Sequence, residues 1–248
     1  MSPTTQPSTA PPGGRSKPIV AIDGPAGSGK TTVSRQVAQR LGYVVLDTGA
    51  LYRAIALATS RARLEPDADG FVEFCQGLVA RGAITLEPGS DGGVRVFLDG
   101  EDVSLAIRTP EMSNRASEVS VVPEVRAALL ELQRQIGQTG GVVVEGRDIG
   151  SVVFPGAEAK FFLTASIDQR AERRFAELSA TTNPPTLDLV REQVIARDRR
   201  DSERAVAPLV RAPDATLMDS TDLGVDQVVE RIVAAVQAIE ARLAARRP

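Results

Sequence analysis

The feature that most constrains this chain is a glycine-rich run at Gly24–Thr31, which reads GPAGSGKT. It satisfies G-x-x-x-x-G-K-[ST], a pattern whose successive backbone N–H groups turn inward around phosphate oxygens. A short apolar run, Pro18–Asp23, precedes it, and the residues that follow predict a helix over Gly29–Leu41. A buried strand, a phosphate loop and a helix in this order are typical of parallel α/β proteins. The motif therefore predicts an α/β fold and a site for a nucleoside triphosphate.

Within this loop, the residue types match the chemistry of a bound triphosphate. The glycines let the backbone approach phosphate oxygens, and the following helix adds the positive end of its dipole. Lys30 is expected to reach the β and γ oxygens, and the Thr31 hydroxyl to bind Mg²⁺. A plain glycine-rich turn is the alternative, but the flanking strand and helix favour phosphate binding. The expected nucleotide-binding set is Gly24, Pro25, Ala26, Gly27, Ser28, Gly29, Lys30, Thr31 and Thr32.

Further apolar runs predict buried strands that alternate with helices, at Tyr43–Asp47, Val142–Glu145, Lys160–Thr164 and Ala215–Asp219. Together with the first run, they predict a doubly wound, five-stranded parallel sheet with ligands outside the carboxyl ends of its strands. A closing amphipathic helix is expected to bury a stripe formed by Val225, Val229, Ile232, Val236 and Ile239.

One segment breaks this alternation of strands and helices. Ala83–Glu87 and Val94–Leu98 are strand-like, and the run PGSDGG at 88–93 between them predicts a hairpin. Two helices, each opened by a proline, are predicted at about 110–120 and 123–138. We therefore expect an inserted subdomain around the hairpin.

Composition excludes several classes of function. The 29 Lys and Arg nearly balance the 32 Asp and Glu, and a net charge of −3 gives no general attraction to nucleic acid or to an anionic membrane. No apolar run reaches the length of about 18 residues that a membrane span needs. The sequence has no histidine, which excludes His–Ser and His–Cys nucleophile pairs and histidine zinc sites.

Two further features bear on the compartment. The only cysteine, Cys75, cannot form an intrachain disulfide and fits a reducing cytoplasm. Residues 1–17 are rich in Pro, Ser, Thr and Gly and have no apolar core, which predicts a disordered tail rather than a signal peptide.

Candidate acceptor-binding residues follow the second predicted strand. Arg53 falls in or near the first turn of the next predicted helix, where the helix dipole disfavours a cation unless an anion is bound nearby. A monophosphate held by Arg53 and the Thr48 hydroxyl would supply that anion. The alternative is a solvated arginine, with Thr48 acting as a simple N-cap.

Charged residues also follow the strand at Val142–Glu145. Glu145 stands where a magnesium-organising acid is found in such folds, and Arg147 could bridge the donor and acceptor phosphates. An ordinary surface turn, with Arg147 neutralised by Asp148, is the alternative. Farther along, the mixed charges of 191–204 either form i,i+4 pairs on a solvated face or belong to a lid that brings arginines over the phosphoryl group.

Four segments together resemble bacterial cytidylate kinases in order and spacing: Ile22–Thr32, Leu46–Arg53, Glu145–Pro155 and Arg197–Leu209. The resemblance extends over about residues 18–240. It implies transfer of the γ-phosphoryl group from ATP·Mg²⁺ to CMP or dCMP, by a cytoplasmic monomer. It also implies one kinase domain over 18–248, with a core at 18–62, 141–168 and 205–248, an acceptor-binding insert at about 63–140 and a lid at about 169–204.

The resemblance also implies roles for individual residues. The acceptor phosphate would meet Thr48, Arg53 and Arg147, and the nucleoside and phosphates on the lid side would meet Arg197, Asp201 and Arg204. Ser117, Arg126 and Asp148 would lie around the cytosine, whose exocyclic amine could donate to Ser117 or Asp148. The implied catalytic residues are Lys30, Arg147 and Arg197, and the implied metal-binding residues are Thr31 and Glu145.

This sequence departs from the family's commoner pattern at two of these positions. Glu145 stands where that pattern has aspartate, and Thr48 where it often has serine. Both substitutions keep the functional group, but the longer glutamate makes the geometry around magnesium less certain.

Other functions of a phosphate-loop protein remain as alternatives. A different small-acceptor kinase of the same fold is possible, although an adenylate kinase usually shows D-G-F-P-R where this chain has EGRD. A GTPase should carry N-K-x-D, which does not occur here. Intact Lys30 and Thr31 argue against a non-catalytic nucleotide sensor, and the charge balance argues against a DNA-acting domain.

Overall fold

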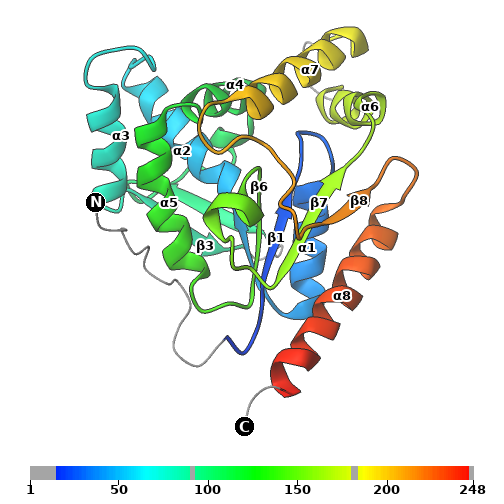
Figure 1. Ribbon diagram of the computed structural model, residues 1–248. Coiled ribbons are helices and arrows are strands. Elements are labelled where there is room, and N and C mark those ends of the chain that lie inside the picture. Colours follow the sequence, from blue (N-terminus) through cyan, green and yellow to red (C-terminus); the bar gives the residue numbers. More distant parts are fainter. Residues whose placement is uncertain (1–14, 90–92, 180–183, 246–248) are drawn as a thin grey trace, which may run out of the picture.

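The computed structural model describes residues 15–89, 93–179 and 184–245 (Figure 1). Its helices and strands follow one another as β1 (Ile19–Asp23), α1 (Lys30–Leu41), β2 (Val44–Asp47), α2 (Thr48–Arg61), α3 (Phe71–Ala80), β3 (Ile84–Pro88), β4 (Val94–Leu98), β5 (Glu101–Asp102), η1 (Ala106–Arg108), α4 (Pro110–Val119), α5 (Pro123–Gly137), β6 (Val142–Gly146), η2 (Ile149–Val153), β7 (Ala159–Thr164), α6 (Ile167–Leu178), α7 (Leu187–Glu203), β8 (Thr216–Asp219) and α8 (Val225–Ala245).

Five strands of the described chain form a parallel sheet in the order β2-β6-β1-β7-β8, which confirms the predicted fold class. The register pairs Asp23 with Gly146 and Asp47 with Glu145, so β1, β2 and β6 end at one edge of the sheet. After β1 the chain passes to one side of the sheet, and after β6 it crosses to the other side. Ligand sites in such sheets lie at this point of reversal, directly after β1.

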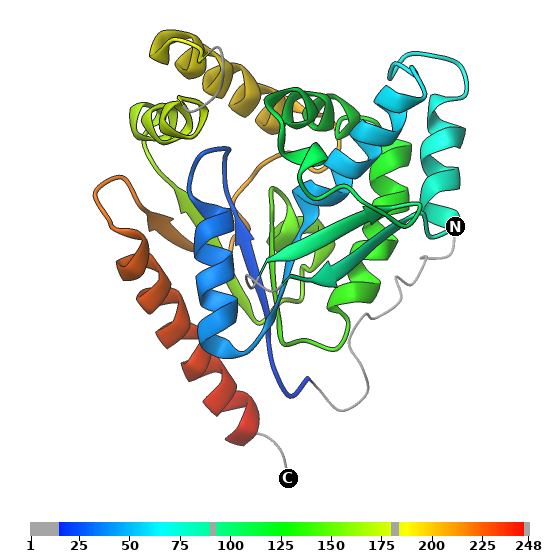
Figure 2. The same ribbon diagram turned by 180° about the vertical axis from the view of Figure 1, so that it is seen from behind.

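Both faces of the sheet are covered by packed elements. Val20 and Ile22 of β1 pack in one apolar cluster with residues of α1 and α8, the two helices that lie side by side in Figure 2. Ile19 and Ala21 belong to a second cluster on the other face, which includes Ile149 of η2. Because β1 is enclosed on both faces, its sequence is a continuous apolar run rather than an alternating one.

The predicted apolar stripe of the closing helix is largely confirmed, with one error. Val229, Ile232 and Val236 are buried and belong to the core cluster, but Val225 is 40% exposed. Val225 is the first residue of α8 and lies at its exposed end, whereas Val228 is only 1% exposed. The buried stripe therefore starts at Val228.

The insert contains a separate antiparallel sheet in the order β3-β4-β5. The pairing of β3 with β4 confirms the hairpin, although residues 90–92 of its predicted turn lie outside the described residues. The two-residue strand β5 was not predicted, because its residues are acidic and exposed and leave no apolar pattern. The insert's core includes Phe71, Leu129 and also Ile55 of α2, so α2 belongs to both parts of the molecule.

Contacts with the domain begin before the predicted start at residue 18. Residues 1–14 of the expected tail lie outside the described residues, but Arg15 forms an ion pair with Glu158 at 3.0 Å. Glu158 also accepts a hydrogen bond from the backbone N–H of Ile19, at 2.9 Å. The same carboxylate thus holds Arg15 and the start of β1. None of the helices in the described segments combines the length and the apolar character needed to cross a membrane.

The burial along α8 makes a matched test possible. We expect Val228→Ala to lower the free energy of unfolding by about 1.5–3 kcal/mol, because it removes two buried methyl groups and leaves a cavity. The same change at the exposed Val225 should alter it by less than about 0.5 kcal/mol. Urea denaturation of both variants measures the difference, and equal losses would contradict this assignment of the buried stripe.

Candidate active site

A cavity of about 290 Å³ lies at the carboxyl edge of the parallel sheet, with α4, α6 and α7 on its far side. Most of the residues singled out in the sequence line it: Ala26, Gly27, Gly29, Lys30, Thr31, Thr32, Thr48, Arg53, Ser117, Arg126, Glu145, Arg147, Asp148, Arg197, Asp201 and Arg204. Gly24, Pro25 and Ser28 belong to the same loop but do not line the cavity. Segments far apart in the sequence therefore meet around one space.

The phosphate loop owes its shape to its glycines. A Cβ atom on Gly24 would lie 1.9 Å from the carbonyl oxygen of Leu163, so only glycine allows the chain to pass β7 this closely. Gly29 has φ of 88°, in the left-handed region, and caps the start of α1. The first N–H groups of α1 are therefore presented directly after the loop, where an anion is favoured.

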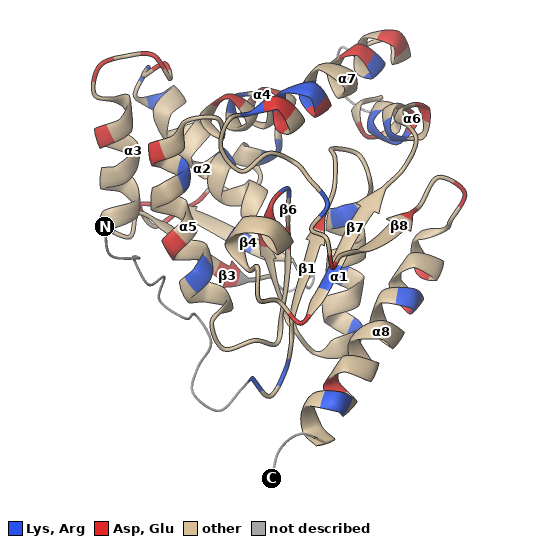
Figure 3. Cartoon of the chain, in the orientation of Figure 1, with Lys and Arg blue, Asp and Glu red and all other residues tan. Residues whose placement is uncertain are grey.

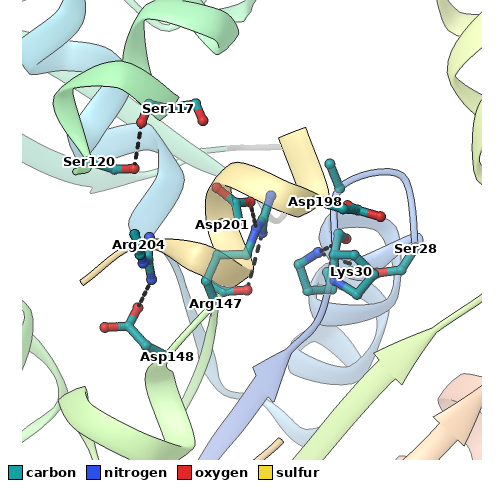
Figure 4. Close-up of polar contacts among 12 residues, drawn as sticks. Ser28, Lys30, Ser117, Ser120, Arg147, Asp148, Asp198, Asp201 and Arg204 are labelled. Atoms are coloured by element: carbon teal, nitrogen blue, oxygen red, sulfur yellow. Dashed lines mark hydrogen bonds and ion pairs between the residues drawn. The ribbon is translucent and has the colours of Figure 1, made fainter. Parts of the chain in front are cut away.

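Lys30 is buried at the centre of this loop (Figure 4). Its ammonium group donates hydrogen bonds to the carbonyl oxygen of Pro25 at 2.6 Å and to Ser28 Oγ at 3.3 Å. Burial lowers the pKa of Lys30 well below its usual value, and the charges of Arg147 and Arg197 lower it further. A nearby polyanion would relieve this electrostatic cost.

Two arginines extend this concentration of positive charge across the cavity. Burial, followed by repulsion from Arg147, lowers the pKa of Arg197 to about 10. Burial acts in the same direction on Arg147, but the charge and hydrogen bond of Asp201 keep the pKa of Arg147 above its usual value. The Nε of Arg147 lies 2.8 Å from Asp201 Oδ2. This pairing does not involve Asp148, so the alternative of a surface turn with an Arg147–Asp148 pair is wrong.

Asp148 is instead held by two arginines from other elements. Its Oδ2 lies 2.5 Å from Arg126 Nη2, and its Oδ1 lies 3.5 Å from Arg204 Nη2. All three side chains are buried. Arg126 also donates to the carbonyl oxygen of Ser120 at 3.2 Å, which ties the group to the end of α4, close to Ser117.

The segment after β2 contradicts the interpretation of Thr48 as an N-cap. The N-cap of α2 is Asp47, which accepts a hydrogen bond from the backbone N–H of Ala50 at 3.1 Å. Asp47 also pairs with Arg53 at 2.6 Å, so the chain itself supplies the anion that balances this cation. Thr48 is not the cap, because its hydroxyl donates to the carbonyl oxygen of Glu145 at 2.8 Å. The hydroxyl proton of Thr48 is therefore used within the protein. In this arrangement only the lone pairs of Thr48 Oγ1 would face a phosphate.

Buried polar atoms without a hydrogen-bond partner are concentrated at this cavity, as far as the described part of the chain shows. Such atoms are costly, and most buried polar groups in folded proteins are paired. Five of these atoms come from residues of α2, α4, β6 and the α7 region that line the cavity. The ones that belong to predicted site residues are Arg53 Nε, Ser117 Oγ, Glu145 Oε1, Arg197 Nε and Arg204 Nη2.

Thr31 and Glu145 offer suitable chemistry for a magnesium ion. The Thr31 hydroxyl donates to Glu145 Oε2 at 3.0 Å, and Glu145 Oε1 is the unpartnered buried oxygen noted above. Burial, and then repulsion from Asp47, raises the pKa of Glu145 to about 7, which a bound cation would reverse. No group of three or more acidic, histidine or cysteine ligands occurs among residues 15–89, 93–179 and 184–245. Mg²⁺ would therefore take its remaining oxygens from phosphates and water, as it commonly does.

Basic and acidic residues are interspersed along α7 (Figure 3). Arg199 and Glu203 form an exposed i,i+4 pair at 3.0 Å, as the solvated-face interpretation predicts. Arg197 and Asp201, one turn apart, line the cavity together with Arg204. The solvated-face interpretation therefore holds for the exposed face of the helix, and the lid stays a prediction.

Asp23 is a residue of this region that the sequence analysis did not single out. Its carboxylate accepts hydrogen bonds from the backbone N–H groups of Ile149 and Gly150, both at 2.7 Å, and so fixes the chain directly after Asp148. Burial raises the pKa of Asp23 to about 6. The sequence did carry a signal, an acid at the end of a strand buried on both faces. Asp47, Tyr52 and Arg174 also line the cavity and were missed.

The surroundings of Lys30 allow a test that separates binding from stability. We expect Lys30→Met to weaken ATP binding by about 10-fold to 100-fold, because a charge-assisted hydrogen bond to phosphate is lost. The free energy of unfolding should stay equal or rise, since a buried cation beside Arg147 and Arg197 is removed. Calorimetric titration and chemical denaturation measure the two quantities. Arg199→Met, on the exposed face of α7, is the control that should leave ATP binding unchanged, and a large loss of stability in Lys30→Met would indicate a structural role.

Comparison with known proteins identifies the family. A family model described as cytidylate kinase matches residues 20–238. A cytidylate kinase of Syntrophotalea carbinolica is 52% identical to this chain, over 88% of this chain and 91% of that protein. The cytidylate kinase of Citrifermentans bemidjiense is 48% identical, with 88% and 92% covered, and that of Geobacter sulfurreducens is 47% identical, with 90% and 94% covered. The chain therefore belongs to the cytidylate kinase family.

Proposed function

We propose that this protein transfers the γ-phosphoryl group of ATP to CMP or dCMP, forming CDP or dCDP and ADP. One observation carries the proposal: cations that repel one another, the buried Lys30 and the partly buried Arg147 and Arg197, face one cavity, which joins the phosphate loop to a buried Arg–Asp–Arg group. Two phosphate-bearing ligands, one on each side of the cavity, would satisfy both charge and hydrogen bonding. The names of its relatives support the choice of cytidylate as the acceptor.

On the donor side, the loop amides and the start of α1 would hold the β and γ phosphates of ATP. Thr31 and Glu145 would hold Mg²⁺, which would supply charge neutralisation at the β and γ oxygens when bound. Lys30 would exchange its bond with Pro25 for one to a phosphate oxygen. Phosphoryl transfer depends on alignment and charge neutralisation rather than on acid–base chemistry, so a site without histidine is adequate.

Between the two ligands, Arg147 and Arg197 would stabilise the charge that spreads over the transferred group. Asp201 already fixes the guanidinium of Arg147 at 2.8 Å, so little reorganisation is needed during the reaction. Arg197 contributes a buried Nε that has no partner within the described residues. Positively charged groups would thus already be in place to stabilise the negative charge of the transition state.

On the acceptor side, the unpartnered Nε of Arg53 would meet the monophosphate, together with Arg147. Asp201 and Arg204 would hold the nucleoside, while Ser117, Arg126 and Asp148 would surround the cytosine. The hydroxyl of Ser117 could accept from the exocyclic amine of cytosine. Uracil carries a carbonyl oxygen at that position and would place one acceptor against another.

We also propose the wider setting that the sequence indicated. The protein would be a cytoplasmic monomer with no nucleic-acid partner, and the near balance of charges and the single cysteine support this. Its one kinase domain would comprise a core (18–62, 141–168 and 205–248), an acceptor-binding insert (about 63–140) and a lid (about 169–204). The separate antiparallel sheet and apolar cluster of the insert support that division.

The acceptor can be tested with a panel of nucleoside monophosphates. We expect CMP and dCMP to stimulate ATP consumption far more than AMP, GMP or UMP, because only cytosine carries both an exocyclic amine and a pyrimidine ring. Production of ADP in a coupled assay gives the comparison. A stronger response to any purine would overturn the assignment of the acceptor.

The role of Ser117 in selecting the base has its own test. We expect Ser117→Ala to raise KM for CMP by about 2-fold to 10-fold, the value of one neutral hydrogen bond, and to narrow the preference over UMP. KM for ATP and the thermal midpoint should not change, because the hydroxyl has no partner within the described protein. Ser34→Ala is a matched control, since Ser34 Oγ is also buried without a partner but does not line the cavity. Equal effects on CMP and ATP would exclude a base-reading role.

A further inference from the structure

A buried arginine that lies outside the cavity connects the phosphate loop to α7. The side chain of Arg170, on α6, is 5% exposed and has three hydrogen-bonded partners. Its Nε donates to the carbonyl oxygen of Ala165 at 3.0 Å, and its Nη1 to the carbonyl oxygen of Ala26, inside the loop, at 3.1 Å. Its Nη2 lies 2.6 Å from Asp198 Oδ2 on α7. One guanidinium group thus links the residue that follows β7, the phosphate loop and α7.

The loop and α6 are in close contact at this residue. A Cβ atom on Gly27 would lie 3.0 Å from the backbone oxygen of Arg170 and 3.2 Å from its Cβ. A shift of α6 would therefore displace the loop or collide with it. The fixed fork of the guanidinium also sets the direction of each hydrogen bond, which a flexible lysine would not do.

Asp198 is the neighbour of Arg197 on α7 and lies one turn before Asp201. Arg197 and Asp201 both line the cavity, whereas Arg170 does not. The second oxygen of Asp198 is buried and has no hydrogen-bond partner among the described residues, so the bond to Arg170 is what holds this carboxylate. The position of Arg197 over the phosphate loop is therefore coupled to the Arg170–Asp198 bond.

We propose that Arg170 and Asp198 are positioning residues, which hold Arg197 and Asp201 in register with the phosphate loop. The proposal rests on the proposed phosphoryl transfer and assigns to this pair the alignment that the transfer requires. Arg170 acts through the loop and through Asp198, and neither residue is asked to touch the transferred group.

The same two helices carry a second ion pair that serves as an internal control. Asp168 of α6 and Arg191 of α7 lie 2.7 Å apart, but their side chains are 69% and 51% exposed. This exposed pair also bridges α6 and α7, yet it touches neither the loop nor the cavity. If the ion pairs only hold α6 and α7 together, loss of either pair should have the same effect on turnover. If the buried pair positions Arg197 and Asp201, only its loss should slow turnover.

The experiment compares Asp198→Asn with Asp168→Asn, which remove the acid from the buried and the exposed pair. We expect Asp198→Asn to lower kcat by about 10-fold to 100-fold, the size of effect that slight misalignment of reacting groups produces. The dissociation constant for ATP should change little, because Arg170 keeps its bond to Ala26. Asp168→Asn should leave kcat and both KM values as in the wild type. Similar kinetics for the two variants would overturn the proposal.

A second variant separates positioning from folding, because an arginine left without its acid could destabilise the domain. The double variant Arg170→Met with Asp198→Leu replaces the pair by apolar side chains, which buried ion pairs often tolerate without loss of stability. We expect this variant to be folded, with a thermal midpoint near that of the wild type, but still slow in turnover. Recovery of wild-type kcat would mean that the pair serves stability alone.

Hydrogen exchange of α7 distinguishes failure of this proposal from failure of the proposed function. In the protein without nucleotides, backbone amides around Arg197 should exchange faster in Asp198→Asn than in the wild type or Asp168→Asn. This result does not depend on which monophosphate is the acceptor. Wild-type protein that phosphorylates no monophosphate would refute the proposed function, whereas unchanged exchange in Asp198→Asn would refute the positioning role.

Discussion

Electrostatic repulsion among three closely spaced cations is the constraint on which the organisation of this site depends. Lys30, which is buried, and the partly buried Arg147 and Arg197 lie close enough together to lower the pKa of Lys30 and of Arg197. Asp201 offsets part of this charge, and Glu145 offsets another part. The packing of the sheet and helices offsets the remaining electrostatic cost. Such an arrangement is preorganised for phosphate, because the donors are already in place before a ligand arrives.

The end of β1 is the structural centre of this arrangement. Asp23, the last residue of the strand, holds the chain after Asp148 through two backbone N–H groups. The loop that starts at the next residue is held from the other side by Arg170, through the carbonyl oxygen of Ala26. Because β1 is central in the sheet and buried on both faces, neither connection can shift without disturbing the core. The strand β1 therefore positions both the donor side and the acceptor side of the cavity.

The sequence was most informative where a local pattern determines structure. The phosphate loop, the five parallel strands and the hairpin could be predicted because glycine, apolar and turn residues act over short distances. The partners of charged side chains could not, because they are fixed by the order of the strands. Arg147 was paired with its neighbour Asp148 in one interpretation, but it reaches Asp201 on α7 instead. Thr48 resembled an N-cap, but Asp47 takes that position, and the Thr48 hydroxyl instead joins the start of α2 to Glu145 of β6.

The sharing of α2 between the two parts of the molecule has a mechanical consequence. Its N-cap Asp47 and its residue Arg53 lie at the cavity, while Ile55 and its neighbours pack in the core of the insert with Phe71 and Leu129. A helix is stiff along its axis. A rotation of the insert would therefore also displace Arg53. In the proposed reaction, the spacing between the two phosphates would consequently depend on close-packed alkyl and aromatic groups remote from either of them.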